Sequence, residues 1–307
     1  MATVVKPAVW DPLAYWRAPA RNFMSSARLH LQHMLFQNTL GFLLEKHVEQ
    51  AIPRAPSSPL RVADLACGNA IWLIDLSCEL ANRGISATLD GFDINDRVFP
   101  APAFLPESIT LETLDIFAKP LPRELIVAYD VIHVRAAVSL ILNADTEPLL
   151  SSVLALLKPG GWLQWEEPAP YFLVQQATPT HEKSACKTLA DSQRPRSEKR
   201  GCKSDYLAEL DQHLARHQFE EVYMTKTFTR KEDYKGWTDD CLMVWEDYVS
   251  QLPSKDTDPQ ADLTKEFWAE HLTKAVVETE KGVALHPEAI FMVVGRKPVE
   301  LPRTSTE

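Results

Sequence analysis

The chain lacks the glycine-rich pattern that holds phosphate groups. In the stretch VADLACGNAIWLID, residues 62–75, an apolar run leads into a turn and then into a helical pattern, but the turn holds a single glycine, Gly68. A phosphate-binding loop carries several glycines and often a Lys-Ser/Thr pair, because the backbone must approach the phosphate closely and offer free amides. DLACGNA has neither, so the sequence disfavours a diphosphate cofactor.

Paired cysteines, an excess of basic residues and long apolar runs are also lacking. The five cysteines are odd in number and never form a C-x-x-C pair, so we expect reduced thiols without a zinc site. The 42 acidic residues outnumber the 32 basic ones, which argues against nucleic acid or an anionic membrane as the main partner. No segment approaches the roughly 20 apolar residues of a membrane span, and the first residues contain no signal-peptide core. We therefore expect a cytoplasmic protein, as a monomer or homodimer.

Short apolar runs that alternate with helical patterns are present from residue 60 onward, which is typical of a parallel sheet flanked by helices. Before them, residues 25–50 predict one kinked helix or two short helices, interrupted at Gly41. The predicted strands are 60–65, 86–94, 108–114, 129–134 and 162–166, followed by 219–229 and 288–297. The predicted helices between them include 71–84, 147–158 and 205–217. The most basic segment, SQRPRSEKRGCKS (192–204), predicts a solvated loop.

Two amphipathic stretches lie between the last two predicted strands and contain Trp237, Trp245 and Trp268. An insertion of this size predicts a helical cap. The sequence therefore divides into an N-terminal helical segment (1–55), a Rossmann-like core (56–230), the cap (231–285), and the last core strand with its tail (286–307).

Carboxylates end three successive predicted strands: Asp64, Asp93 and Asp115. In an open parallel sheet, ligands bind at the carboxyl ends of the strands. Asp64 can meet a cationic amine, Asp93 can accept both hydroxyls of a ribose, and Asp115 can accept an adenine amino group. S-adenosylmethionine carries these groups and no phosphate. Each carboxylate also has a purely structural interpretation as a helix cap, a turn residue or the start of a loop.

Several segments resemble the class I S-adenosylmethionine-dependent methyltransferases, above all those of fungal secondary metabolism. They are RLHLQHMLFQNTLG, VADLACGNAIWLIDLS, GFDI, YDVIHVRAAVSLI and LLKPGGWLQWEE, between residues 28 and 167. The resemblance implies a seven-stranded, mostly parallel Rossmann-like sheet with its last two strands antiparallel, and S-adenosylmethionine as cofactor.

The resemblance also implies positions for the cofactor. Asp64, Ala66 and Gly68 would line its methionine moiety, Asp93 with Ile94 its ribose, Leu114 and Asp115 its adenine, and Val134 and Arg135 its sulfonium. Alanine stands at Ala66 and Ala70 where this family commonly has glycine. A positive φ at either alanine would cost about 1 kcal/mol or more.

Candidates for the chemistry are few, because a sulfonium methyl group is already activated and the enzyme mainly aligns the acceptor and excludes water. His133 is the first candidate for a base that deprotonates a phenol or enol, and His33 the second. Glu167, Trp237 and Trp245 are candidates for substrate contact. The alternatives are packing roles for the histidines and tryptophans and a solvated strand end for Glu167. His213 and His217 have metal-ligand spacing but no evident third ligand, so we expect no metal.

Three functions compete at this point. The first is O-methylation of a phenol or enol on a small apolar, polyketide-like or aromatic metabolite. The second is a pericyclic or cyclisation step assisted by the fixed charge of the cofactor, suggested by the replaced glycines. The third is a non-catalytic regulator of secondary metabolism with the same fold.

Overall fold

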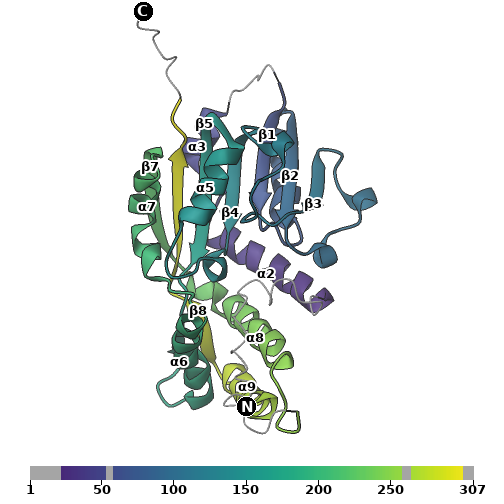
Figure 1. The fold of residues 1–307 in the computed structure, drawn as a ribbon. Coiled ribbons are helices and arrows are strands. Elements are labelled where there is room, and N and C mark those ends of the chain that lie inside the picture. Colours follow the sequence, from purple (N-terminus) through teal and green to yellow (C-terminus); the bar gives the residue numbers. More distant parts are fainter. Residues whose placement is uncertain (1–21, 53–57, 258–263, 300–307) are drawn as a thin grey trace, which may run out of the picture.

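A computed structural model of the protein describes residues 22–52, 58–257 and 264–299. The other parts of the predicted N-terminal segment, of its Pro/Ser connector and of the C-terminal tail lie outside the described residues. The centre of the fold is a seven-stranded sheet with the strand order β3-β2-β1-β4-β5-β9-β7 (Figure 1). Its strands are β1 (Leu60–Leu65), β2 (Ala87–Asp93), β3 (Ile109–Thr113), β4 (Tyr129–Arg135), β5 (Leu157–Pro168), β7 (Glu220–Phe228) and β9 (Ala289–Arg296).

The direction of the strands confirms a mostly parallel sheet. β1 to β5 run parallel to one another, whereas β9 runs antiparallel to both β5 and β7. β7 and β9 therefore pair antiparallel, as the resemblance implies, but β7 points the same way as β1 to β5 and only β9 is reversed. The carboxyl ends of β1 to β4 consequently meet at one edge of the sheet.

Both faces of the sheet are covered by helices, which explains why the inner strands β1, β4 and β9 are buried over most of their length, whereas the edge strands β3 and β7 are largely exposed. α3 (Lys46–Ala51) and α4 (Ile71–Asn82) share a buried cluster with Val62 and Leu89 on one face. α5 (Glu147–Leu156) and α7 (Leu210–Arg216) cover the other face, where Ala63 and Leu65 point. Short 3-10 helices occupy several connections: Asp96–Val98, Pro102–Phe104, Arg123–Leu125, Val138–Leu140, Asp205–Glu209 and Lys231–Asp233.

The predicted helical segment at 25–50 consists of two helices and not of one kinked helix. α2 (Phe23–Leu40) ends at Gly41, which adopts φ 82° and donates its amide to Gln37 O. Only a residue without a Cβ takes this left-handed conformation at no steric cost, so the glycine ends the helix. Over its length, α2 crosses beneath the sheet, between the sheet and α8 (Figure 1).

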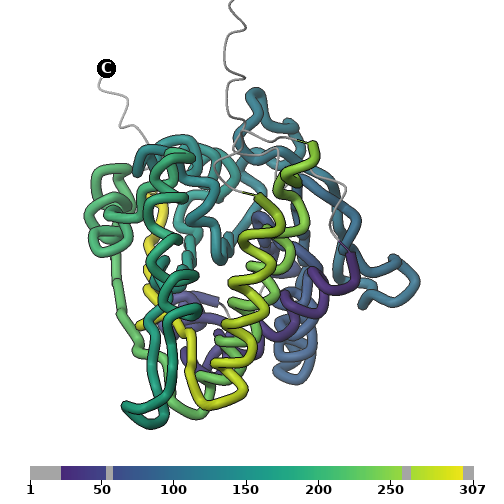
Figure 2. The backbone as a smooth tube through the Cα atoms, turned by 90° about the horizontal axis from the view of Figure 1, so that it is seen from below, coloured from purple at the N-terminus to yellow at the C-terminus, as the bar shows by residue number. Residues whose placement is uncertain are grey.

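The cap is a small unit with its own core. It contains α6 (Ser184–Lys199), α8 (Tyr234–Ser250), α9 (Lys265–Glu280) and a two-stranded antiparallel sheet of β6 (Phe172–Gln176) and β8 (Val283–Pro287). β6 and α6 lie in the segment predicted as core and outside the predicted cap range 231–285, but they pack against β8 and α9. Figure 2 shows the three helices side by side when the molecule is seen from below. Cys186, Leu189, Trp245, Trp268 and Leu285 are buried together between these elements. None of the described helices has the length and apolar character needed to cross a membrane.

The prediction of a solvated loop at residues 192–204 is wrong over its first half. α6 continues to Lys199 with Pro195 inside it. Its start is fixed from a distance, because Glu278 of α9 accepts hydrogen bonds from Ala185 N at 2.9 Å and Cys186 N at 2.8 Å. Tertiary contacts of this kind override local propensity. The sequence interpretation also missed the short strands β6 and β8.

Candidate active site

A cavity of about 340 Å³ lies between the carboxyl edge of the sheet and the cap. This volume is in the range of small-molecule sites. The sheet contributes the turn after β1, with Ala66 and Gly68, and the ends of the next strands, with Asp93, Leu114 and Asp115. α2 and the cap close the other sides with Arg28, Leu29, Arg196, Trp237, Asp240, Trp245 and Tyr248.

The turn after β1 is held in a strained conformation. Ala66 has φ 60°, Gly68 58° and Ala70 61°, so all three lie in the left-handed region. A Cβ at Gly68 would lie 2.9 Å from Leu29 Cδ1, so a larger residue at this position would require the end of the Leu29 side chain to shift. The side chain of Asn69 ties the turn to α2, because its Nδ2 donates to Ser26 O at 3.1 Å. The two alanines therefore carry the unfavourable backbone conformation that the sequence analysis treated as costly.

We expect Ala66→Gly to raise the free energy of unfolding by up to about 1.6 kcal/mol. Relief of the left-handed alanine is worth about 1–2 kcal/mol, and the greater freedom of glycine in the unfolded chain offsets about 0.4–1 kcal/mol of this. The matched control is Ala87→Gly in β2, where glycine should cost about 0.5–1 kcal/mol. Urea unfolding of both variants checks this, and equal losses of stability would contradict a strained turn.

Most of the predicted cofactor residues come together on the cavity wall. Ala66, Gly68, Ile94 and Leu114 line it, as do Asp93, Asp115 and Arg135. Asp93 orients the turn, because its Oδ2 accepts from Gly68 N at 2.9 Å and its Oδ1 from Asn95 N at 3.0 Å. Asp115 Oδ1 accepts from Phe117 N at 3.0 Å. Asp64 and Val134 are buried inside the sheet and are absent from the cavity lining.

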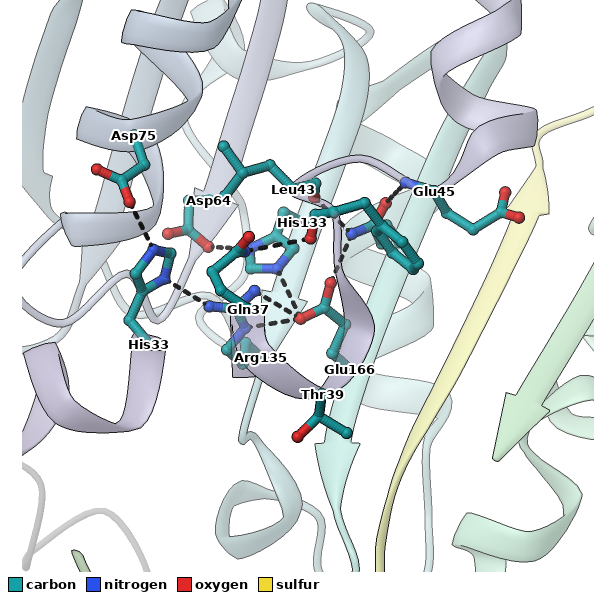
Figure 3. Close-up of polar contacts among 12 residues, drawn as sticks. His33, Gln37, Thr39, Leu43, Glu45, Asp64, Asp75, His133, Arg135 and Glu166 are labelled. Atoms are coloured by element: carbon teal, nitrogen blue, oxygen red, sulfur yellow. Dashed lines mark hydrogen bonds and ion pairs between the residues drawn. The ribbon is translucent and has the colours of Figure 1, made fainter. Parts of the chain in front are cut away.

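Behind the wall lies a buried network of charged side chains (Figure 3). It arises from strand register, because Asp64 of β1 is the partner of His133 in β4, and Arg135 is the partner of Glu166 in β5. His133 Nδ1 donates to Asp64 Oδ1 at 2.7 Å, and its Nε2 lies 3.7 Å from Glu166 Oε2. Trp72 stacks on the imidazole at 3.7 Å. Burial opposes the charge on His133, but the two carboxylates outweigh it and raise its pKa.

Arg135 connects this network to α2 and to the cavity. Its Nε and Nη2 both lie 2.7 Å from Glu166 Oε2, and the pKa of Glu166 falls to about 2 because Arg135 and His133 outweigh its burial. On the other side, Arg135 Nη1 donates to His33 Nδ1 at 2.9 Å, while His33 Nε2 lies 2.9 Å from Asp75 Oδ2. Nδ1 must then accept, so His33 is neutral and donates from Nε2. Burial and the nearby Arg135 lower its pKa accordingly.

The geometry does not support His133 or His33 as the base. A general base must come within hydrogen-bond reach of the acceptor. Both imidazoles are buried, their ring nitrogens face protein groups, and neither lines the cavity. Arg135 links both rings to the cavity, because it donates to His33 and binds Glu166, which lies beside His133.

Glu167 is likewise turned away from the cavity. It is fully buried and accepts from Ala137 N at 2.7 Å, Val138 N at 3.1 Å and Trp165 Nε1 at 2.7 Å. Burial outweighs these donors and raises its pKa to about 8. The side chain fixes the segment after β4, in which Ala136 has φ 54° and lines the cavity with Val138. Its contacts therefore suit a residue that holds the loop after β4 in place. The other two candidates for substrate contact, Trp237 and Trp245, do line the cavity.

Sequence reasoning missed three charged residues of the wall: Arg28, Arg196 and Asp240. Asp240 of α8 is 2% exposed, and its Oδ1 lies 3.4 Å from Arg28 Nη1. Burial raises the pKa of Asp240. A carboxylate three residues after Trp237, on the apolar face of a helix, is the signal that could have revealed it. Within the described ranges, no cluster of three or more His, Cys, Asp or Glu is arranged to hold a metal ion.

No family model matches the chain, but comparisons with individual proteins do. Methyltransferase grgD from Penicillium sp is 34% identical over 145 residues, which is 46% of this chain and 48% of that protein. N-methyltransferase tcpN from Claviceps purpurea is 31% identical over 150 residues, or 48% of this chain and 50% of that protein. The similarity thus spans about half the length of these relatives.

A solved structure extends the likeness over nearly the whole fold. The plantazolicin methyltransferase BpumL, in complex with SAH, superposes with a TM-score of 0.50 over 94% of this chain and 93% of that one, at 13% sequence identity. At this identity the likeness concerns the fold alone. The chain therefore has a Rossmann-like methyltransferase fold and, over about half its length, is similar in sequence to fungal proteins named methyltransferases, which confirms the resemblance that its motifs predict.

Proposed function

We propose that the protein is an S-adenosylmethionine-dependent methyltransferase that methylates a hydroxyl of a small, largely apolar or aromatic acceptor. The observation that carries this proposal is the cavity, which joins the Gly68 turn and the carboxylates Asp93 and Asp115 to an aromatic cap. The relatives named methyltransferases and the structural neighbour in complex with SAH support the same cofactor.

The residues on the wall fit this cofactor. Asp93 would accept the ribose hydroxyls beside Ile94, and Leu114 with Asp115 would contact the adenine. Ala66 and Gly68 would lie along the methionine moiety, whose carboxylate would meet the guanidinium of Arg28 or Arg135. When bound, S-adenosylmethionine supplies an activated methyl group. Asp64 and Val134 would not touch the cofactor. Asp64 would support the wall through its pair with His133, and Val134 through its packing.

Asp240 is the wall residue best suited to accept the proton of the acceptor hydroxyl. Its burial raises its pKa, and a carboxylate with a raised pKa is a stronger base than an exposed one. Arg28 on α2 holds one of its oxygens. Trp237 and Trp245 wall the same space and would exclude water from the reacting groups.

A hydroxyl acceptor suits the charges of the wall better than an amine. Four arginines line the cavity, namely Arg28, Arg135, Arg196 and Arg200, against three carboxylates, Asp93, Asp115 and Asp240. A protonated amine would enter beside these cations at a cost in repulsion, whereas a hydroxyl that becomes an oxyanion would be attracted. The relative tcpN carries the name N-methyltransferase, so paired acceptors are needed to decide between the two atoms.

The proposed function is tested with paired phenol, enol and aniline acceptors in the presence of S-adenosylmethionine. S-adenosylhomocysteine should form in step with an O-methylated product. Transfer to nitrogen alone would contradict hydroxyl methylation, and isomerisation of an acceptor with the cofactor intact would favour the cyclisation alternative. No turnover with any acceptor would count against an enzyme and for a regulator.

With a phenol that the protein methylates as the substrate, we expect Asp240→Asn to lower kcat about 100-fold or more near neutral pH, because a positioned base contributes about 10²–10⁴-fold to the rate. The rate should recover as the pH rises toward the pKa of the phenol, since the acceptor then ionises by itself. The matched control is Asp239→Asn, which changes the neighbouring carboxylate that pairs with Lys235 outside the cavity. Equal rates for Asp240→Asn and the unchanged protein would rule out this base.

A further inference from the structure

The cap end of the cavity contains an arginine held among aromatic rings. Arg196 of α6 lines the cavity, and its guanidinium carbon lies 3.5 Å from the ring centroid of Tyr248, 4.3 Å from that of Trp245 and 5.6 Å from that of Trp268. These three rings are called the aromatic cage below. Because a cation over several π faces is restricted in orientation, the cage holds the guanidinium at the cavity wall.

No carboxylate of the described chain pairs with this cation. Arg196 Nε is buried and has no hydrogen-bond partner among the described residues. Arg194, on the same helix, gives the contrast, because it is exposed and pairs with Glu198 and Asp205 at 2.9 and 3.2 Å. Burial, together with the nearby Arg200, lowers the pKa of Arg196 to about 10, so the group remains a cation near neutral pH.

A half-buried cation whose polar neighbour is the tyrosine of its own cage, and not a carboxylate, is costly unless a ligand supplies the negative charge. A guanidinium presents its N–H donors in a planar fork that matches a carboxylate or an enolate oxygen pair. The surroundings are otherwise apolar, since Phe172, Val244 and Trp245 line the cavity near the same helices. The occupant that fits this end is therefore an anionic oxygen group on an aromatic or apolar frame.

The carboxylate of the cofactor is a less suitable occupant. Arg28 precedes Leu29, whose side chain contacts the Gly68 position, and Arg135 ends the strand beside β1. These two arginines are next to the turn after β1, whereas Arg196 belongs to the cap with α8 and α9. Cofactor and acceptor would then each have guanidinium groups of their own.

We propose that Arg196 binds an anionic oxygen group of the acceptor, so that the protein selects aromatic or apolar acids as its substrates. This inference rests on the proposed function, because the acceptor meant is that of methyl transfer. The interaction proposed is a charge-assisted hydrogen bond between Arg196 and this oxygen group, away from the atom that is methylated.

The test uses a pair of probes of nearly the same shape, 1-naphthaleneacetate and its neutral amide 1-naphthaleneacetamide, titrated calorimetrically into the protein saturated with S-adenosylhomocysteine. The acid should bind the unchanged protein at least about tenfold more tightly than the amide, the smallest effect of one charge-assisted hydrogen bond. Arg196→Gln should bring the two affinities to within about twofold of each other. The matched control Arg194→Gln should retain the preference.

Other outcomes would overturn the proposal. They are equal binding of acid and amide to the unchanged protein, no binding of the acid, or a preference that survives in Arg196→Gln. A tenfold loss of affinity for S-adenosylhomocysteine itself in Arg196→Gln would assign the arginine to the cofactor and overturn the proposal too. If the unchanged protein binds no S-adenosylhomocysteine, the proposed function fails, while the same probes titrated into the ligand-free protein still decide the role of Arg196.

Discussion

Glu166→Gln is expected to lower the free energy of unfolding by about 3–5 kcal/mol, the usual cost of removing one partner of a buried ion pair. Glu166 is fully buried, and Arg135 Nε and Nη2 both lie 2.7 Å from its Oε2. His133 Nε2 lies 3.7 Å from the same oxygen. Glutamine keeps the shape but not the charge, so the buried guanidinium of Arg135 would lose its anion and the ring of His133 one of its two carboxylate neighbours. Urea unfolding at neutral pH measures the loss.

The matched control is Glu79→Gln on the surface of α4, whose carboxylate lies 3.4 Å from Arg83 Nη1. Exposed pairs of this kind contribute about 0.3–0.5 kcal/mol, so this variant should barely change stability. Combining Glu166→Leu with Arg135→Met should be less destabilising than the sum of the single changes, because cation and anion are then removed together. Additive losses would show that the two side chains are not coupled.

The loss of unfolding free energy in Glu166→Gln should also depend on pH. The pKa of Glu166 is lowered to about 2 in the folded protein from an ordinary value of 4.5. An acid whose pKa is lower in the folded than in the unfolded protein stabilises the fold at pH values above its unfolded-state pKa. This stability is lost as the pH falls through its folded-state pKa. The difference between the unchanged protein and the variant should therefore be largest above pH 4.5 and shrink between pH 4.5 and about 2. A difference that stays constant across this window would exclude an ionised Glu166.

The sheet could be predicted well because its inner strands are apolar runs and its edge strands alternate apolar with polar residues, and turn residues bound them. β1 begins and ends where the sequence predicts it, and the other core strands differ mostly at their ends. β6 and β8 were missed because each has five residues, and their partners, Phe172 with Pro287 for example, are more than 100 residues apart in the chain. α6 was missed because Glu278 fixes its start from another helix.

The sequence likewise predicts the position of some residues of the candidate site and not of others. Strand ends predict where Asp93 and Asp115 lie, because parallel strands that end together place their last side chains at one edge. Asp64 also ends a strand, but the register of β1 against β4 sets it opposite His133, and the two pair inside the sheet. Register across strands far apart in sequence cannot be read from one chain, since a shift of one residue reverses every side chain. For Arg135 the sequence left two possibilities open, a role at the sulfonium or an ion pair with an acid such as Glu166, and the register of β4 against β5 forms the ion pair.

Asp93→Ala is expected to weaken binding of S-adenosylmethionine and S-adenosylhomocysteine by about 100-fold or more. In the proposed arrangement Asp93 accepts both ribose hydroxyls, and a hydrogen bond to a charged group is worth about 1.5–3 kcal/mol. Two such bonds exceed the roughly 2.8 kcal/mol of a 100-fold change. The side chain is 5% exposed and lines the cavity, so water would replace it poorly. Calorimetric titration measures the affinity, and Asp96→Ala, an exposed carboxylate three residues on, is the matched control.

Asp93 also holds Gly68 N and Asn95 N, so a weakened site could reflect a displaced turn rather than a lost ribose contact. Asp93→Asn retains an oxygen that can accept a backbone amide and separates the two effects. The decisive comparison uses 2′-deoxy-S-adenosylhomocysteine. Removing the hydroxyl should cost the unchanged protein about tenfold or more in affinity and cost Asp93→Ala almost nothing, because the partner is already gone. An equal penalty in both proteins would mean that Asp93 does not touch the ribose, and the cofactor would then have to lie elsewhere along the carboxyl edge of the sheet.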